Sequence, residues 1–520
     1  MDDRLTTLLD DLTRVGELSA ADKSRLARRA AWLGEAPPPA QQEFLAALLT
    51  LTVPLEEPAD DLLRAMLAGL AKSRWGAELP ADYCQSVSRL YTHLGPPSRA
   101  RGQLLAALAS GGSTDEVTTL VNLLVDDPPT DEADVVLALG PLFQAKSLPL
   151  DALFPKLFAA LAHQSLAAAV LDLANHVTRH QFAAEHPAKG ILDSLLQMLG
   201  QLVGSLGVLT ESPPIAGQTM ADVGRQVAQS VALAVSLCDA LALIGDPQAA
   251  GKLFQALDLG HRRLRTEAAA ALARLGEERG KEELVRLAAE PVARLRVLAY
   301  AQELGMMPRI APEHCTPVAR AEAELTVWLS EPTQFGLPPS ACELFDQRQQ
   351  FWPGFHQPVQ CYLFRFTYAL TIDGQERSYS NIGIAGPLAH AFTADLADLS
   401  PDDIYAAYAG WQAQHEEIRE YEVSRLSRSE RTEVDRLQRR LHDAGYSAIE
   451  PQQMGYFFSE KALIAWAQRD EIPGIAIADF QEITFFPILS PRKSLGVREA
   501  YSVYKGRKLL RTFNRAETTV

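Results

Sequence analysis

The chain has 520 residues, long for one domain, and 47% of them are hydrophobic, so two or more domains with sizeable cores are expected. Its formal net charge of -16 and pI near 5.2 argue against a general nucleic-acid coat or a binder of anionic membranes, because both need a basic surface. The five cysteines are odd in number and show no CxxC spacing, which favours a reducing cytoplasm and signals neither a disulfide framework nor a zinc site.

The N-terminus, MDDRLTTLLDDL, is acidic and amphipathic, so it lacks the basic start and unbroken apolar core of a signal peptide. The most apolar window, from Val227 to Gly245, approaches the length of a membrane span but contains Gln229 and Asp239. We expect this window to be a helix buried among other helices, and we expect no membrane association.

Residues 1–330 have an almost wholly helical pattern, with apolar residues recurring three and four apart, as in QEFLAALLTL and EVTTLVNLLV. Short breaks rich in proline and glycine, such as LGPPSRARG and DDPPTDEA, interrupt the pattern. The sequence therefore predicts antiparallel helices joined by short turns.

Two segments late in this region repeat one pattern, a helix end, a glycine, a polar turn and a second amphipathic helix. They run over residues 240–257 and 271–288. Their glycines, Gly245 and Gly276, lie 31 residues apart, and Gly305 follows 29 residues later. A period near 30 is typical of stacked helical repeats, in which no repeat buries its apolar face alone.

The segment HRRLRTEAAAALARLGEERGKEELVRLA resembles the short HEAT-like repeat first associated with phycobilisome linker-lyase proteins. The resemblance covers roughly residues 81–306, and the helices of residues 1–80 are more divergent. It implies a curved α-solenoid that holds partners, and some members of this class are enzymes or chromophore lyases. The iron-binding branch, deoxyhypusine hydroxylase, needs recurring His-Glu pairs that this region lacks, so no metal or cofactor is implied.

After Pro332 the aromatic content rises and strand-like alternation appears. The run QCYLFRFTYAL places its aromatic residues on one face, and the turn at Asp373 and Gly374 reverses it into RSYSNIGIA. The predicted fold is thus multidomain: an all-α superhelical solenoid of the HEAT/armadillo type over residues 1–330, then an α+β domain with an antiparallel sheet over residues 331–520.

Further elements are predicted in this second domain. Helices are expected from Pro387, from a Ser400 cap, around HEEIREYEVSRL, from a capping box at Ser427 to Gly445, and from Ser459 to Arg469. Strands are expected at GIAIAD and EITFFPI, and a hairpin at AYSVYKGRKLLRTF.

Gly383 and Gly386 stand where a strand is expected to meet the helix from Pro387. Main-chain N-H groups and the helix dipole hold anions at such a turn. Against this use, the segment lacks the Lys-Ser/Thr of a P-loop, and Pro387 removes one donor. We favour a structural turn and leave a ligand-binding loop as the alternative.

The sequence offers weak candidates for catalysis. His390 and Asp395 are five residues apart on the expected helix, so they do not share the face that residues four apart would share. Cys361 becomes a nucleophile only if a histidine approaches it, and a buried thiol in a strand is the better interpretation. The zincin spacing is absent after His415 and Glu416, so no metal ligands are assigned.

Two groups of basic residues are candidate binding sites. The segment Arg492 to Arg515, which includes Arg507 and Lys508, interleaves basic and aromatic side chains, as proteins that bind single-stranded nucleic acid do. In an acidic chain we favour contact with protein or with the chain itself. Arg262 and Arg263 stand at a repeat turn, where they are placed to meet a ligand.

These patterns favour a cytoplasmic, non-catalytic scaffold or adaptor that binds a protein partner on the helical-repeat surface. The second domain would cap the solenoid or add a second binding site. The alternative is an enzyme of unknown class acting on an anionic small molecule in that domain, and a third hypothesis uses the basic segment to bind nucleic acid. The sequence names no partner, oligomeric state or pathway.

Overall fold

The computed structural model describes residues 3–14, 24, 26, 33, 35–70, 82–211, 220–372, 375–488 and 495–514. Contacts divide the chain into two compact units, Met1–Leu284 and Val285–Val520, which we call the helical unit and the C-terminal unit. The change from helices to strands comes later, because the first strand begins at Ala341. The C-terminal unit therefore includes two helices that precede its strands.

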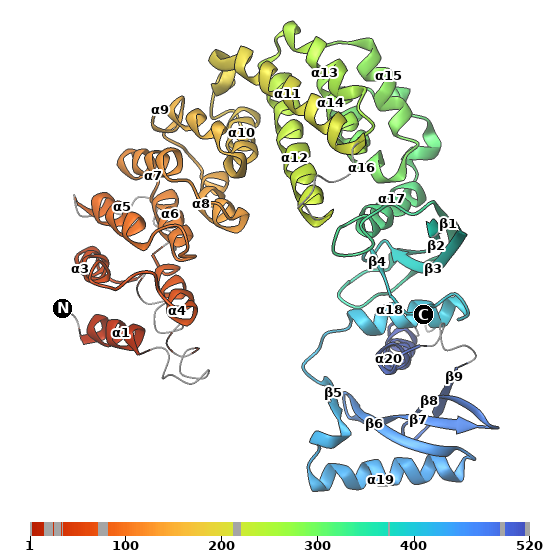
Figure 1. Cartoon of the computed structure of the whole chain (residues 1–520). Helices are drawn as coiled ribbons and strands as arrows, with labels where there is room; N and C mark the ends of the chain where they lie inside the picture. The colour runs from red at the N-terminus through yellow and green to blue at the C-terminus, as the bar shows by residue number, and fades with distance from the viewer. Residues whose placement is uncertain are drawn as a thin grey trace. The chain divides into compact units, whose positions relative to one another are not determined.

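The first region is helical, as predicted (Figure 1). Its described helices are α1 (Asp3–Thr13), α3 (Pro38–Leu48), α4 (Glu57–Leu67), α5 (Tyr83–Leu94), α6 (Arg101–Gly111), α7 (Thr114–Asp126), α8 (Glu132–Gln144), α9 (Leu150–Leu153), α10 (Gln164–Arg179), α11 (Leu192–Glu211), α12 (Met220–Ile244), α13 (Ala250–Leu257), α14 (Arg262–Arg274) and α15 (Glu278–Leu287).

The helices of this unit fall into two ranks. In the first rank, α4, α6, α8, α10, α12 and α14 each contact the next helix named. In the second rank, α3 contacts α5, α5 contacts α7, and α11 contacts α13. Helices of both ranks bury leucine and alanine side chains. This arrangement explains why the apolar stripe recurs along the sequence.

Each glycine of the predicted sequence repeat lies just after the end of a helix. Gly245, Gly276 and Gly305 follow α12, α14 and α16 (Pro291–Glu303), with φ angles of 74°, 91° and 67°. Glycine adopts these left-handed angles without the steric cost that a Cβ atom brings, so the predicted helix ends are confirmed.

α12 carries the apolar window noted in the sequence. Within the described residues, Asp222–Ile244 is the stretch of helix long and apolar enough to cross a membrane, and 56% of its most apolar window is buried in the protein. The helix packs against α10, α11 and α14, and its leucines are buried.

The C-terminal unit contains two antiparallel sheets. The first has the order β1 (Ala341–Gln350), β2 (Val359–Ile372), β3 (Gln375–Ala385) and β4 (His390–Ala391). The second has the order β5 (Ile418–Glu422), β6 (Ser447–Phe457), β7 (Glu460–Arg469), β8 (Ile472–Ala478) and β9 (Ile483–Pro487). The helices are α16, α17 (Pro317–Leu329), α18 (Pro401–Gln412), α19 (Arg428–Asp443) and α20 (Val497–Asn514).

These elements are layered. α17 packs on one face of the first sheet, against the aromatic side chains that β2 directs to that side. The other face of this sheet and the inner face of the second sheet enclose α18 and α20 (Figure 1). α19 covers the outer face of the second sheet. The unit thus has helices in its middle layer and on both outer sides.

α18 and α20 cross with their backbones in close contact. A Cβ atom on Gly506 would lie 1.7 Å from the carbonyl oxygen of Ala406, and one on Gly410 would lie 1.9 Å from that of Ser502. No other residue fits at these two positions without moving a helix. Glycine inside a helix is unfavourable in isolation, so here packing overrides helix propensity.

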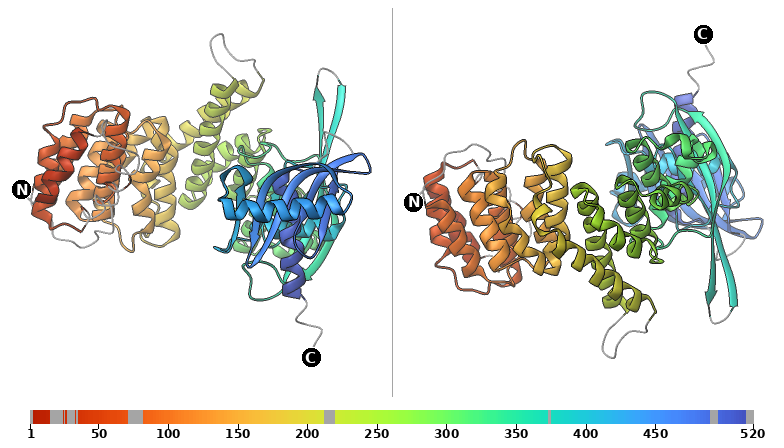
Figure 2. Two further views of the ribbon diagram at one scale, coloured as in Figure 1. Left: turned by 90° about the horizontal axis from the view of Figure 1, so that it is seen from below. Right: turned by 90° about the horizontal axis from the view of Figure 1, so that it is seen from above.

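Several local predictions for the C-terminal unit are confirmed. β2 and β3 pair as a hairpin that projects from this unit in Figure 2, and the predicted turn at residues 373–374 lies outside the described residues. Ser400 caps α18 by accepting a hydrogen bond from the Asp403 N-H. Ser427 and Glu430 form the predicted capping box of α19.

Four predicted elements are wrong. Residues 387–399 form a loop and β4 rather than a helix, because the buried amide of Asn381 bonds the main chain of Phe392, Ala394 and Leu396. The expected charged helix around HEEIREYEVSRL contains strand β5.

The other two errors exchange helix and strand. Residues 460–469 form strand β7 rather than a helix. Both faces of this strand are buried, so its apolar residues form a continuous run instead of alternating with polar ones. The segment AYSVYKGRKLLRTF, expected to be a hairpin, is part of helix α20. Its Gly506 lies where α20 crosses α18 and not in a turn.

Candidate functional site

The glycines proposed to hold an anion are packing positions. Gly383 lies in β3, where an added Cβ atom would approach a Leu325 methyl carbon to 2.8 Å. Gly386 has a φ of 104°, and an added Cβ atom would lie 2.2 Å from the carbonyl oxygen of Gln360. No helix begins at Pro387, so the helix dipole on which the anion-binding hypothesis depended is missing.

His390 belongs to an aromatic cluster. Its ring stacks on Trp411 with a centroid distance of 3.9 Å and meets Trp328 edge-on at 5.0 Å. Burial lowers the pKa of His390 to about 4, so the imidazole is neutral at physiological pH. Asp395 instead accepts a hydrogen bond from the Ala397 N-H at 2.9 Å. The two side chains therefore have separate structural roles.

Cys361 is fully buried in β2. Its Sγ lies 3.7 Å from the carbonyl oxygen of Val359, and burial raises the pKa of the thiol to about 12. The thiolate is the nucleophilic form, and it is not populated at neutral pH in this environment. These contacts fit the buried-thiol interpretation.

The candidate cations of α20 are paired inside the C-terminal unit. Arg507 donates from Nε to Asp403 at 2.7 Å, and Lys508 bonds Asp479 at 2.6 Å as well as Glu460. Two more basic residues proposed with them, Arg492 and Lys493, lie outside the described residues, as does Arg515. Within the described part of α20, these two cations neutralise the unit's own acids.

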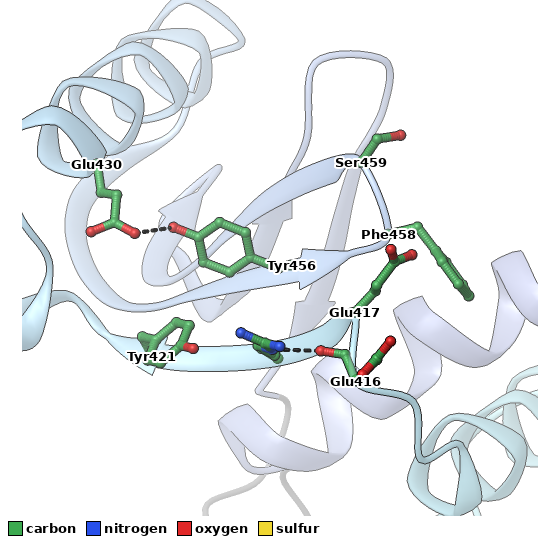
Figure 3. A pocket seen from close by; sticks show the side chains of 8 residues that line it. Glu416, Glu417, Tyr421, Glu430, Tyr456, Phe458 and Ser459 are labelled. Atoms are coloured by element: carbon green, nitrogen blue, oxygen red, sulfur yellow. Dashed lines mark hydrogen bonds between the residues drawn. The ribbon is translucent and has the colours of Figure 1, made fainter.

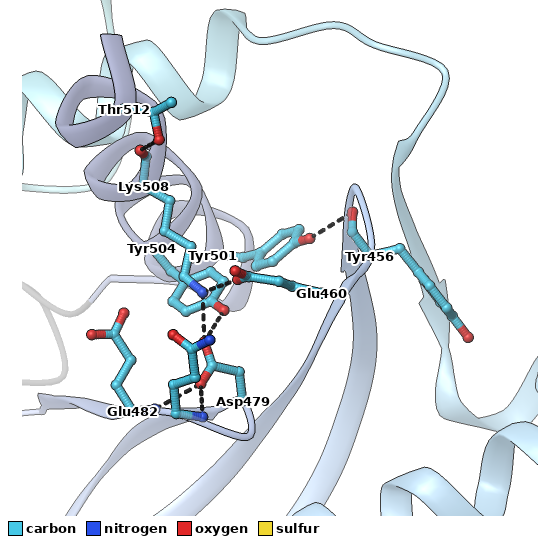
Figure 4. Close-up of polar contacts among 9 residues, drawn as sticks. Tyr456, Glu460, Asp479, Glu482, Tyr501, Tyr504, Lys508 and Thr512 are labelled. Atoms are coloured by element: carbon cyan, nitrogen blue, oxygen red, sulfur yellow. Dashed lines mark hydrogen bonds and ion pairs between the residues drawn. The ribbon is translucent and has the colours of Figure 1, made fainter. Parts of the chain in front are cut away.

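Lys508 belongs to a buried polar network at the end of β8 (Figure 4). Asp479 accepts four hydrogen bonds, two from main-chain N-H groups of the following turn and two from Tyr504 and Lys508. Burial acts to raise the pKa of Asp479, but the bonds from Lys508, Tyr504, Glu482 and Gln481 outweigh it and lower the pKa to about 2. We call this group the Lys508 network.

A hollow of about 570 Å³ lies on the α19 side of β5 (Figure 3). We call it the β5 pocket and define it by six residues: Glu416, Glu417, Arg419, Tyr421, Glu430 and Tyr456. The Tyr456 hydroxyl donates to Glu430 at 3.0 Å, and Arg419 donates from Nε to the Glu416 carbonyl oxygen at 2.5 Å. The pocket has three carboxylates and one guanidinium, so it is negative overall.

Sequence reasoning missed the β5 pocket because it assigned these residues to a charged helix. The alternation in IREYE was the available signal: it places Arg419 and Tyr421 on one face of a strand, with Glu420 and Glu422 on the other. A run this polar is compatible with either a helix or an exposed strand. Pairing with β6 makes it a strand.

In the helical unit, Arg262 and Arg263 begin α14 and are exposed, as expected. Arg263 lies close enough to Asp172 of α10 to interact electrostatically with its carboxylate. On the neighbouring helix α12, Asp239 accepts bonds from Arg179 and from Arg274, the latter at 3.1 Å.

We call the charged residues of these three helices the polar strip: Asp172, Arg179, Asp239, Arg263 and Arg274. Asp172 is exposed, yet the surrounding protein raises its pKa by desolvation.

Comparisons with known proteins give no family. No family model and no curated protein matches this chain. A crystal structure of an engineered protein aligns with 64% of this chain and 95% of its own length, at 16% identity and a TM-score of 0.19. A score this low carries no argument about fold or function. Within the described residues, no cluster of three His, Cys, Asp or Glu side chains is arranged to hold a metal ion.

Proposed function

We propose that this protein is a non-catalytic scaffold whose helical unit is a HEAT-like solenoid that holds a protein partner. Two observations support the solenoid: the helices fall into two ranks, and glycines near a 30-residue period end α12, α14 and α16. Stacked repeats of this kind expose one long face of each rank, which suits an extended interface.

The polar strip is the observation that carries this proposal. It crosses three neighbouring helices of one rank and contains charges of both signs around the exposed Asp172. On α8, which contacts α10, Glu132 accepts a hydrogen bond from Gln229 of α12 at 3.2 Å, and Val136, one turn further along, is 69% exposed. Mixed charges beside an exposed apolar side chain suit a protein surface.

The alternative, an enzyme acting on an anionic small molecule, receives no support from its proposed residues. Gly383 and Gly386 are closed by neighbouring atoms, His390 is held neutral among aromatic rings, and Cys361 is a buried thiol. The nucleic-acid hypothesis is weakened because Arg507 and Lys508 are already paired with acids. We keep a cytoplasmic location as part of the proposal, since the five cysteines are unpaired.

Affinity capture from the native cytoplasm tests the proposal. The variant Val136→Arg/Asp172→Arg changes the surface beside and within the polar strip. The control Asp193→Arg/Gln197→Arg makes the same change in charge on exposed positions of α11, in the other rank. We expect one protein to be retained in stoichiometric amount by the wild type and the control, and to be lost from the first variant.

Retention of the same proteins by all three chains would refute the proposed surface. Retention of a small molecule with no protein would refute the scaffold. Circular dichroism must show equal helix content in the three chains, because loss of folding would mimic loss of binding.

A further inference from the structure

Strand β5 has an open edge. It lies at the end of its sheet and pairs only with β6 in the described sheet. The Phe458 N-H donates to the Glu417 carbonyl oxygen at 3.1 Å, which sets the alternation of main-chain bonds along the pair. In this register the N-H and C=O of Glu420 point away from β6. An edge of this kind is a template for a further strand.

The β5 pocket lies on the face of β5 that carries Arg419 and Tyr421. Tyr456 of β6 and Glu430 of α19 line its far side, so β5 separates the pocket from the open edge (Figure 3). Tyr421 is 41% exposed and meets the Tyr456 ring edge-on at 5.7 Å. Phe458, 43% exposed, forms an apolar wall at one end and contacts the His415 ring. Aromatic faces bordered by acids attract the guanidinium or ammonium group of a ligand.

Two of the three acids of the pocket are available to a ligand. Among the described residues, Glu416 and Glu417 take part in no ion pair, and Arg419 bonds a carbonyl oxygen rather than a carboxylate. Glu430 is ionised, because hydrogen bonds from the Ser427 side chain and main chain and from Tyr456 lower its pKa. The pocket therefore presents negative charge beside an edge that offers main-chain hydrogen bonds.

We propose that the β5 edge and the β5 pocket together bind an extended, basic peptide segment of a partner protein. The segment adds as a strand beside β5, and an arginine or lysine side chain enters the pocket between the tyrosine rings and the glutamates. The main chain of the segment supplies the hydrogen bonds, and the basic side chain supplies specificity. This site lies wholly within the C-terminal unit, so it does not depend on the polar strip.

Fluorescence anisotropy with the full chain tests this proposal. The probe is a labelled seven-residue peptide of alternating threonine and valine with a central arginine. Two matched peptides serve as comparisons, one with glutamate at the centre and one N-methylated at alternate main-chain nitrogens. We expect both comparison peptides to bind about tenfold more weakly or worse, since one loses charge complementarity and the other loses main-chain donors.

Two variants locate the site. Glu416→Lys/Glu417→Lys should weaken binding of the arginine peptide about tenfold or more. Asp435→Lys/Asp443→Lys makes the same charge change on exposed positions of α19 and should have little effect. Equal binding of the arginine and glutamate peptides, or equal loss in both variants, would overturn the pocket. Undiminished binding of the N-methylated peptide would overturn strand addition.

Discussion

The Lys508 network and the β5 pocket use the same kinds of side chain in opposite ways. Both combine tyrosine, carboxylates and one long cation around the same sheet, and Tyr456 lies between the pocket and helix α20, which carries Lys508. The Tyr456 hydroxyl donates to Glu430 in the pocket, while its carbonyl oxygen accepts from Tyr501 of α20 at 3.4 Å. In the network Lys508 pairs with both Asp479 and Glu460, whereas in the pocket Arg419 bonds a carbonyl oxygen rather than a carboxylate.

This difference follows from exposure to solvent. Asp479 is 2% exposed, and an unpaired charge at such a position costs several kcal/mol in the free energy of folding. Water stabilises the carboxylates of the open pocket, so they can remain without a cation until a ligand arrives. Satisfied charge in the interior stabilises the fold, and unsatisfied charge at the surface is available for recognition.

Gly506→Val, at the crossing of α18 and α20, should have the largest effect on stability. Its side chain would collide with the backbone of α18, so we expect a loss of more than about 4 kcal/mol or failure of the C-terminal unit to fold. Urea unfolding followed by tryptophan fluorescence reports mainly this unit, which holds four of the six tryptophans. The matched change Gly251→Val, on α13 of the helical unit where an added Cβ meets nothing, should shift the unfolding of that unit little when it is followed by circular dichroism.

Lys508→Met removes the cation of the network and keeps much of its volume. Asp479 would stay buried without its main counter-charge, so we expect the free energy of unfolding to fall by about 3–5 kcal/mol. Lys461→Met removes a lysine whose Nζ lies 3.8 Å from Glu433 near the surface, and it should cost less than about 1 kcal/mol. Similar losses in the two variants would contradict the distinction between paired charges in the interior and charges near the surface.

Asp479 of the Lys508 network should make the free energy of unfolding fall at acidic pH. The pKa of Asp479 is lowered to about 2 in the folded chain from an ordinary value near 3.8. The unfolded chain binds the proton first, so this contribution is present above about pH 4 and is lost as the pH falls through 2. The stability difference between the wild type and Asp479→Asn should shrink by roughly 2 kcal/mol between pH 5 and pH 2. A constant difference across this range would show that Asp479 does not titrate as described.

Arg419→Met should have the smallest effect. Arg419 is exposed and its described bond is to a carbonyl oxygen, so we expect the free energy of unfolding to change by less than about 0.5 kcal/mol. Urea unfolding measures this change under the conditions used for Lys508→Met. A loss approaching that of Lys508→Met would mean that the β5 pocket is a structural network too.

Predictability from the sequence differed between the two units for a physical reason. Helical periodicity and glycine ends are local signals, so residues 1–330 were predicted as helical and Gly245 and Gly276 as helix ends. The C-terminal unit was predicted where local chemistry dominates, as at the caps of α18 and α19. It was mispredicted where contacts distant in sequence decide, as in β7, buried on both faces, and in α20, whose glycine meets another helix.

The candidate site residues show the same limit. His390, Cys361, Gly383 and Gly386 carry chemistry that sequence alone leaves open, and their neighbours assign them structural roles. Those neighbours come from strands and helices up to tens of residues away. Conversely, the β5 pocket was missed because its residues come together only when β5 pairs with β6.

The middle position of α20 has a consequence for how the chain is made. The ribosome synthesises α17, both sheets, α18 and α19 before it synthesises α20, the element that fills the space between the sheets. Until then, α18 is the one helix that can pack between the inner faces of the two sheets. The helical unit can assemble helix by helix during synthesis, whereas the C-terminal unit must hold its sheets unfinished until α20 leaves the ribosome. During this interval the apolar inner faces of the sheets are exposed to solvent and prone to aggregation.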